Sequence, residues 1–166
     1  MDLSIRPIAP AEHTALGEIT AHAYLDDGLL DFGADDPYLE KLRDVPRRAA
    51  EADVLVAVGA DGTLLGGVTY AQPGNPWADI AGPDEAEFRM LAVAQAARGL
   101  GAGEALVRAC IDRAQGTDGV ARLVLSTTPT MLTAHRVYRR LGFLRTPERD
   151  WEPIPGLPLH TYSLSF

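Results

Sequence analysis

Six residues, 98–103, read Arg-Gly-Leu-Gly-Ala-Gly and connect an expected strand at 85–93 to an expected helix at about 101–115. Glycines let the backbone approach a ligand oxygen without a Cβ in the way. The start of a helix offers unpaired N–H groups and a partial positive charge, to which Arg98 adds a fixed one. The segment therefore predicts an anion-binding turn, although a tight strand-to-helix turn without a ligand explains the same residues.

The spacing of these glycines decides against a dinucleotide-binding turn of the Rossmann type. That turn needs Gly-x-Gly-x-x-Gly early in a βαβ unit. Counting from Gly99, the last glycine of the pattern falls on Glu104, and counting from Gly101 it falls on Leu106. Neither count fits, so the segment does not match a Rossmann turn.

Length and charge limit the classes of protein that the chain can represent. Its 166 residues suit one domain, residues 1–166, and its net charge of −8 makes nucleic acid an unlikely partner and favours cationic ligands. No apolar run approaches the roughly 20 residues that span a membrane, and the first residues lack a secretory signal. The single cysteine, Cys110, is compatible with a reducing compartment. We therefore expect a cytoplasmic enzyme or binding protein without membrane contact.

Hydrophobic periodicity predicts a mixed α/β chain with strands and helices in the order β α α β β β α β α β β. The expected strands are 3–6, 54–58, 64–70, 85–93, 123–125, 143–148 and 159–164. The expected helices are 11–24, 37–52, 101–115 and 131–141. Pro46 is expected to break the second helix, Thr130 to cap the last one and Gly142 to end it.

Two segments resemble the GCN5-related N-acetyltransferase (GNAT) family. Met90-Leu91-Ala92-Val93 followed by residues 98–103 is similar to its acetyl-CoA motif, Gln/Arg-x-x-Gly-x-Gly/Ala. The later segment at 134–143 resembles the family pattern Ala-x-x-x-Tyr-x-x-x-Gly-Phe. The order of strands and helices matches as well. The resemblance implies a GNAT fold, a central mostly antiparallel sheet of about seven strands flanked by about four helices.

The resemblance also implies an acetyl-CoA-dependent N-acetyltransferase, with acetyl-CoA as co-substrate and no metal. Backbone groups of the strand before the turn would bond the pantetheine and polarise the thioester carbonyl. The matching residues there are Leu91, Ala92 and Val93. The pyrophosphate would lie on Arg98, Gly99, Leu100, Gly101, Ala102 and Gly103. The histidines show no metal-ligand spacing.

Tyr138 matches the family tyrosine that protonates or hydrogen-bonds the leaving thiolate, a role that suits its hydroxyl donor. A core aromatic is the alternative, because Tyr138 shares one helical face with Met131, Ala134 and Leu141. Many family members have asparagine at the position of Met131. The contact of that asparagine with the pantetheine is therefore absent or replaced here.

Glu87 is the candidate general base, since some family members carry a base on this strand. A carboxylate there would remove the amine proton, directly or through water. The alternative is a surface glutamate or an ion pair with Arg89, and Glu85 is the second candidate for the base.

The acceptor is expected to be a primary amine of a small molecule or peptide. Aspartates between Asp26 and Asp36 fall where the family places its acceptor-binding segment, and a solvated acidic loop explains them equally well. Two other functions remain open, namely a non-catalytic acyl-CoA-binding sensor and an aminoacyl-tRNA acetyltransferase. A homodimer is a further possibility.

Overall fold

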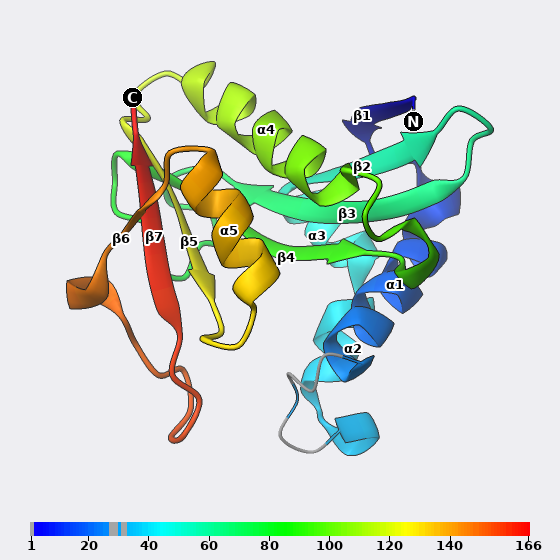
Figure 1. The fold of residues 1–166 in the computed structure, drawn as a ribbon, viewed down its shortest axis with the longest axis horizontal. Coiled ribbons are helices and arrows are strands. Elements are labelled where there is room, and N and C mark those ends of the chain that lie inside the picture. The colour runs from blue at the N-terminus through cyan, green and yellow to red at the C-terminus, as the bar shows by residue number, and fades with distance from the viewer. Residues whose placement is uncertain (1, 27–29, 31–32) are drawn as a thin grey trace. The chain divides into compact units, whose positions relative to one another are not determined.

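The computed structural model describes residues 2–26, 30 and 33–166, whose elements are labelled in Figure 1. The chain forms two compact units. We call Met1–Tyr70 with Met90–Cys110 the first unit, and Ala71–Arg89 with Ile111–Phe166 the second unit. Strand β4 (Glu85–Val93) and helix α4 (Ala102–Gln115) each contribute residues to both.

Seven strands form one sheet in the order β1-β2-β3-β4-β5-β7-β6. The remaining strands are β1 (Leu3–Pro7), β2 (Asp53–Gly59), β3 (Leu64–Ala71), β5 (Arg122–Thr127), β6 (Leu144–Arg145) and β7 (His160–Ser165). The pairs β1/β2, β2/β3, β5/β7 and β6/β7 are antiparallel, whereas β4 and β5 are parallel. The predicted mixed α/β fold with a mostly antiparallel sheet is confirmed.

The core of the first unit follows from the period of two along β2. Val54, Val56 and Val58 project from one face of the strand and pack with Leu16 of α1 (His13–Asp26) and Val45 of α3 (Val45–Glu51). Helix α1 approaches the sheet closely. A Cβ at Gly67 of β3 would lie 2.6 Å from Leu16 Cδ1, so a larger residue there would force the Leu16 side chain to move.

The second expected helix, 37–52, is two helices in the structure. Helix α2 (Tyr38–Arg43) ends at Asp44, and the Asp44 carboxylate accepts a hydrogen bond from the N–H of Arg47 at the start of α3. Pro46 lies in the first turn of α3, where a missing N–H costs nothing. The break thus comes at a capping residue before the proline, and the described residues form five helices rather than four.

The second unit packs α5 (Leu132–Arg140) against β5 and β7, which lie side by side in Figure 1. Gly142, with φ of 98°, ends this helix as predicted. The predicted cap by Thr130 is wrong, because the N-cap is Met131 and no side chain caps the helix. The parallel register of β4 and β5 runs from Glu85↔Arg122 to Glu87↔Val124, while β5 stays paired with β7 as far as Thr127.

Candidate active site

The glycine turn, residues 98–103, lies on the first unit between a 3₁₀ turn at Gln95–Ala97 and the start of α4. Gly99 and Gly101 have φ of 82° and 85°, the left-handed region in which a side chain is strained. Both glycines are exposed, as are Arg98 and Leu100. The turn thus places exposed glycine backbone directly before the N-terminal end of α4, a geometry suited to binding an anion.

The last residues of β4 lie directly under this turn. A Cβ on Gly103, in the first turn of α4, would meet Val93 Cγ2 at 3.6 Å. On the other side a Cβ on Gly66 of β3 would collide with the Ala92 carbonyl oxygen, and Ala94 N–H donates to Leu65 O at 2.8 Å. The structure thus brings together the residues predicted to bind the cofactor: Leu91, Ala92, Val93, Arg98, Gly99, Leu100, Gly101, Ala102 and Gly103.

Met90 begins this segment with an unusual backbone. It is the one non-glycine residue in the described ranges with a positive φ, 55°. A bulky side chain in this region is strained and persists only where its surroundings hold it, often at a functional site. The local backbone of β4 is therefore distorted two residues before Ala92.

Tyr138 lies on α5 in the second unit and is 4% exposed. Its ring centroid lies 6.0 Å from that of Phe88, 5.9 Å from that of Phe143 and 5.7 Å from that of Tyr162. The ring is thus held by aromatic packing, as the alternative interpretation expected. Such packing fixes the direction of the hydroxyl and is compatible with a donor role.

Glu87 is 1% exposed, so the surface alternative for it is wrong. Its Oε1 accepts hydrogen bonds from the N–H groups of Asp79 at 2.9 Å, Ile80 at 2.8 Å and Ala81 at 3.0 Å. We call these three N–H groups the Glu87 amide cluster. Burial raises the pKa of Glu87, and the amide cluster opposes that effect by stabilising the carboxylate.

Glu85, two residues earlier, is in a different electrostatic state. Its carboxylate accepts hydrogen bonds from both Nη groups of Arg149, at 2.8 and 3.0 Å, and from Arg122 Nε at 2.7 Å. Despite burial, these arginines together with the N–H of Gly82 lower the pKa of Glu85 to about 2. A carboxylate with such a pKa is a weak proton acceptor near neutrality, so Glu85 is a poor second candidate for the base.

Comparison with known proteins decides the family. The profile of the Acetyltransferase (GNAT) family matches residues 18–143. The chain belongs to this family. An uncharacterized N-acetyltransferase from Schizosaccharomyces pombe is 35% identical over 104 residues, which cover 63% of this chain and 59% of that relative. The match thus spans about three fifths of the curated relative.

Solved structures agree with this GNAT assignment. A GCN5-related N-acetyltransferase from Kribbella flavida is 26% identical with a TM-score of 0.71, covering 99% of this chain and 98% of that chain. YncA from Salmonella typhimurium, solved with its cofactor acetyl-CoA, is 21% identical with a TM-score of 0.70, covering 99% and 94%. The second likeness shows the fold alone, and both neighbours extend over nearly the whole chain.

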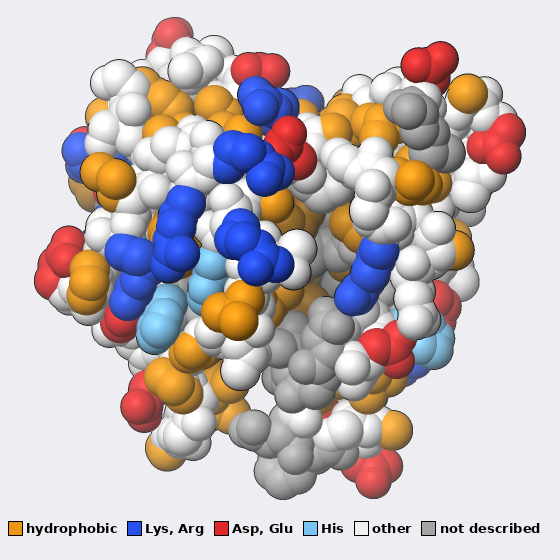
Figure 2. All heavy atoms as spheres, in the orientation of Figure 1, with side chains coloured by type: hydrophobic (Ala, Val, Ile, Leu, Met, Phe, Trp, Pro, Cys, Tyr) orange, Lys and Arg blue, Asp and Glu red, His pale blue; other side chains and the backbone are white. Residues whose placement is uncertain are grey.

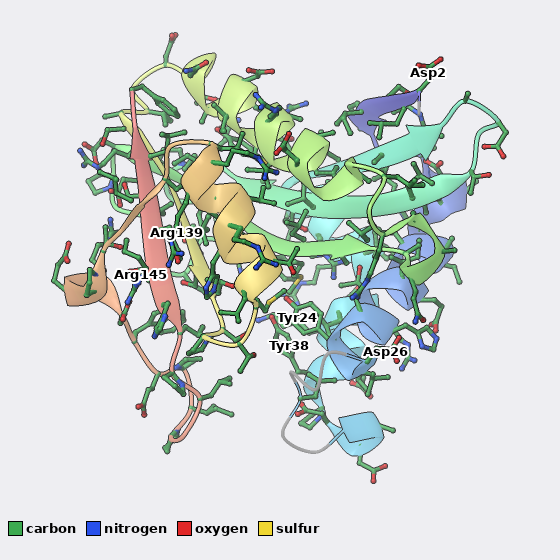
Figure 3. All side chains as sticks on the ribbon, in the orientation of Figure 1. Asp2, Tyr24, Asp26, Tyr38, Arg139 and Arg145 are labelled. Atoms are coloured by element: carbon green, nitrogen blue, oxygen red, sulfur yellow. The ribbon has the colours of Figure 1, made fainter. Side chains whose placement is uncertain are left out.

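The acidic segment of this GNAT chain is described in part. Asp27 and Asp31 lie outside the described residues, whereas Asp26, Asp35 and Asp36 lie within them. Figure 3 labels Asp26 at the end of α1 together with Tyr24 and Tyr38, whose ring centroids are 6.2 Å apart. Sequence reasoning missed this tyrosine pair, because the two residues come from different helices.

Other residues considered from the sequence have structural partners. His135 is buried, its Nε2–H donates to the Thr128 carbonyl at 3.0 Å, and burial lowers the pKa of its ring. Trp151 Nε1 donates to Ser126 Oγ at 3.0 Å, and Cys110 is buried as expected. Figure 2 shows basic side chains over α5, the helix that carries the exposed residues Arg136, Arg139 and Arg140.

Within the described ranges, no three or more His, Cys, Asp or Glu side chains gather in a way that would hold a metal ion. No helix within these ranges is both long and apolar enough to cross a membrane.

Proposed function

We propose that this GNAT protein is an N-acetyltransferase that moves an acetyl group from acetyl-CoA to a primary amine, directly and within a ternary complex. The observation that carries the proposal is the glycine turn, in which two exposed left-handed glycines lead into the start of α4. Residues 98–103 would hold the pyrophosphate, with Arg98 supplying a positive charge. The acetyl-CoA in the Salmonella neighbour supports this choice of donor.

The backbone of Leu91, Ala92 and Val93 would hold the pantetheine and the thioester carbonyl. Support comes from the closeness of the strand end and the turn, since a Cβ added at Gly103 would lie 3.6 Å from Val93 Cγ2. The strained backbone at Met90, directly before these residues, also supports it, because such strain is often found at functional sites. Because residues 18–143 match the family, we further propose that 1–166 forms one acetyltransferase domain.

Two side chains would handle the protons of the reaction. Acetyl-CoA supplies the acetyl group, whose carbonyl carbon forms the new C–N bond as the C–S bond breaks. Glu87 takes the proton from the attacking amine, and its raised pKa makes the carboxylate a stronger proton acceptor than an ordinary glutamate. Tyr138 donates its hydroxyl proton to the departing thiolate sulfur. Bulk solvent then restores both groups to their starting protonation states.

The acceptor would be a small-molecule or peptide amine, and a cationic one is favoured by the net charge of −8. Incubation with acetyl-CoA and a panel of amines, with detection of released thiol, tests the activity. Thiol release and an acetylated amine are expected for at least one member. Tight acetyl-CoA binding without release for any amine would favour the sensor, and a strongly salt-dependent affinity for aminoacyl-tRNA would favour the tRNA enzyme.

Tyr138→Phe tests the role of the hydroxyl, with Tyr162→Phe as the matched control. Both tyrosines are buried and their rings touch, while Tyr162 OH has no hydrogen-bond partner among the described residues. We expect Tyr138→Phe to lower kcat by about 100-fold with acetyl-CoA affinity kept, and Tyr162→Phe to leave kcat unchanged. Equal turnover of both variants and the wild type would reduce Tyr138 to a packing residue.

A further inference from the structure

Charged side chains hold the loop at 77–82 along its length by hydrogen bonds and an ion pair. This loop precedes β4 in the second unit. Arg89 Nη1 donates to Trp77 O at 3.1 Å, and Arg89 Nη2 pairs with Asp79 at 3.1 Å. Glu87 binds the next three N–H groups, and Glu85 Oε1 accepts from Gly82 N–H at 2.9 Å. The loop is therefore positioned by its contacts with β4 rather than by a regular ladder.

One hydrogen bond to this loop comes from a distant part of the sequence. Arg149 ends the 3₁₀ turn at Pro147–Arg149, between β6 and β7, and its Nη2 donates to the Ile80 carbonyl at 2.9 Å. That carbonyl and the Ala81 N–H belong to the same peptide group. The Ala81 N–H in turn donates to Glu87 Oε1 at 3.0 Å. Arg149 and Glu87 thus hold the two ends of one peptide dipole.

We infer that Arg149 is a positioning residue for Glu87, which acts by orienting the Ile80–Ala81 peptide toward the Glu87 carboxylate. A charged donor on a carbonyl polarises the peptide and strengthens its N–H as a donor. The bidentate pair with Glu85 holds the guanidinium in the geometry that this contact requires. The effect of Arg149 on rate rests on the proposed role of Glu87 as the base, whereas its effect on the Glu87 carboxylate does not.

Several charged groups affect the pKa of Glu87, and some raise it while others lower it. Asp79 in the loop raises the pKa of Glu87, Arg89 on β4 lowers it, and Arg149 is coupled to Glu87 by direct attraction. Arg122 on β5 is directed to Glu85 and Asp84 instead. Loss of Arg149 therefore removes both a direct attraction and a supporting contact on the amide cluster, so it should favour the protonated acid.

Arg122 offers a matched control, because it shares the Glu85 carboxylate with Arg149. Arg122 Nε donates to Glu85 Oε2, and Arg122 Nη2 donates to the Asp84 carboxylate, whereas Arg149 donates to the loop carbonyl. Arg122→Gln and Arg149→Gln thus each remove one ion pair from Glu85. Only Arg149→Gln removes the bond to Ile80 O.

The experiment measures the Glu87 carboxylate directly, by ¹³C NMR titration of protein with carboxyl-labelled glutamate, in the wild type and both variants. Glu87→Gln assigns the signal. In Arg149→Gln we expect the pKa of Glu87 to rise by about 0.5–1 unit, with no rise in Arg122→Gln. The acidic limb of the kcat/KM profile should move to higher pH by the same amount. Arg149→Lys should give a smaller rise, since one ammonium replaces a planar fork of donors.

An unchanged Glu87 titration in Arg149→Gln, or the same rise in Arg122→Gln, would overturn the inference. A rise in the titration without movement of the kcat/KM profile would leave the role of Arg149 intact and instead contradict Glu87 as the base. Circular dichroism checks folding. If Arg149→Gln does not fold, Arg149→Lys decides, because a Glu87 pKa equal to that of the wild type would then count against the inference.

Discussion

Backbone N–H groups gather at two places in this chain, and the two places differ in the partner of these groups. At the Glu87 amide cluster, three consecutive N–H groups meet a buried carboxylate of the chain itself. At the glycine turn, the backbone of Gly99 and Gly101, just before α4, faces solvent. The first arrangement stabilises an internal charge, and the second provides the exposed anion site that our proposed cofactor role needs.

The two places are also built by different means. The glycine turn depends on residues 99 and 101 adopting a left-handed backbone that other residues avoid. The loop of the amide cluster depends instead on side chains from elsewhere, Glu85, Arg89 and Arg149. Local conformation thus makes the first site, whereas side-chain hydrogen bonds, one of them from the distant Arg149, hold the second.

The largest expected effect comes from neutralising Glu87, the carboxylate bound by the amide cluster. Glu87→Gln keeps an oxygen for the amide cluster but removes the proton acceptor, so kcat should fall by about 10²–10⁴-fold. Wild-type kcat/KM should fall as pH drops through the raised pKa of Glu87, because the base becomes protonated. In the variant this acidic limb should vanish from the pH–rate profile.

Glu12→Gln is the control for this change. Glu12 also accepts a backbone N–H, from Ala9, and pairs with Arg6 in the first unit. Its variant should retain both the rate and the acidic limb. Survival of the limb in Glu87→Gln would show that another group is the base.

A second, smaller effect is expected from introducing backbone strain into the glycine turn. Gly101→Val forces a β-branched residue into a φ of 85°, and acetyl-CoA affinity should fall by about 100-fold as the turn rearranges. Isothermal titration calorimetry measures that affinity. Gly62 in the β2–β3 hairpin has the same φ, and at both positions an added Cβ meets no atom within 4 Å.

Gly62→Val is therefore a control with equal backbone strain at a different place. Both valine variants should lose similar thermal stability, while only Gly101→Val should lose acetyl-CoA affinity. Equal affinities of the two variants would argue against pyrophosphate binding at the glycine turn.

The smallest effect concerns the ion pairs that fasten the loop. Glu85 has a folded pKa of about 2 against 4.5 for the free group, so its stabilisation is present above about pH 4.5 and is lost as pH falls toward 2. Glu85→Gln should lower the free energy of unfolding at pH 7 by about 2 kcal/mol and flatten its decline in acid. Urea denaturation at several pH values measures both changes.

Asp84→Asn is the comparison for Glu85→Gln. Asp84 pairs with the same Arg122 but is half exposed, so its removal should cost less than about 0.5 kcal/mol. Equal losses from the two variants would mean that burial of Glu85 adds nothing to its ion pairs.

Prediction from the sequence succeeded where the signal was local. The glycines of the turn, the bounds of β4 at Glu85–Val93 and the end of α5 at Gly142 all follow from backbone preferences of neighbouring residues. It failed at the start of α5 and at the break between α2 and α3. The α2–α3 break comes at Asp44 before the proline, and α5 begins without a side-chain cap, so the preference of a single residue did not fix either helix end.

The sequence by itself determined the fold family and the place of the glycine turn, because periodicity and glycine conformation act within a few residues. Only the tertiary structure decided that Glu87 is buried on three amide groups while Glu85 is held ionised by two arginines. Both are glutamates on one strand, two residues apart. Their partners come from positions 79–82, 122 and 149, and no local pattern shows which charges a folded chain will bring together.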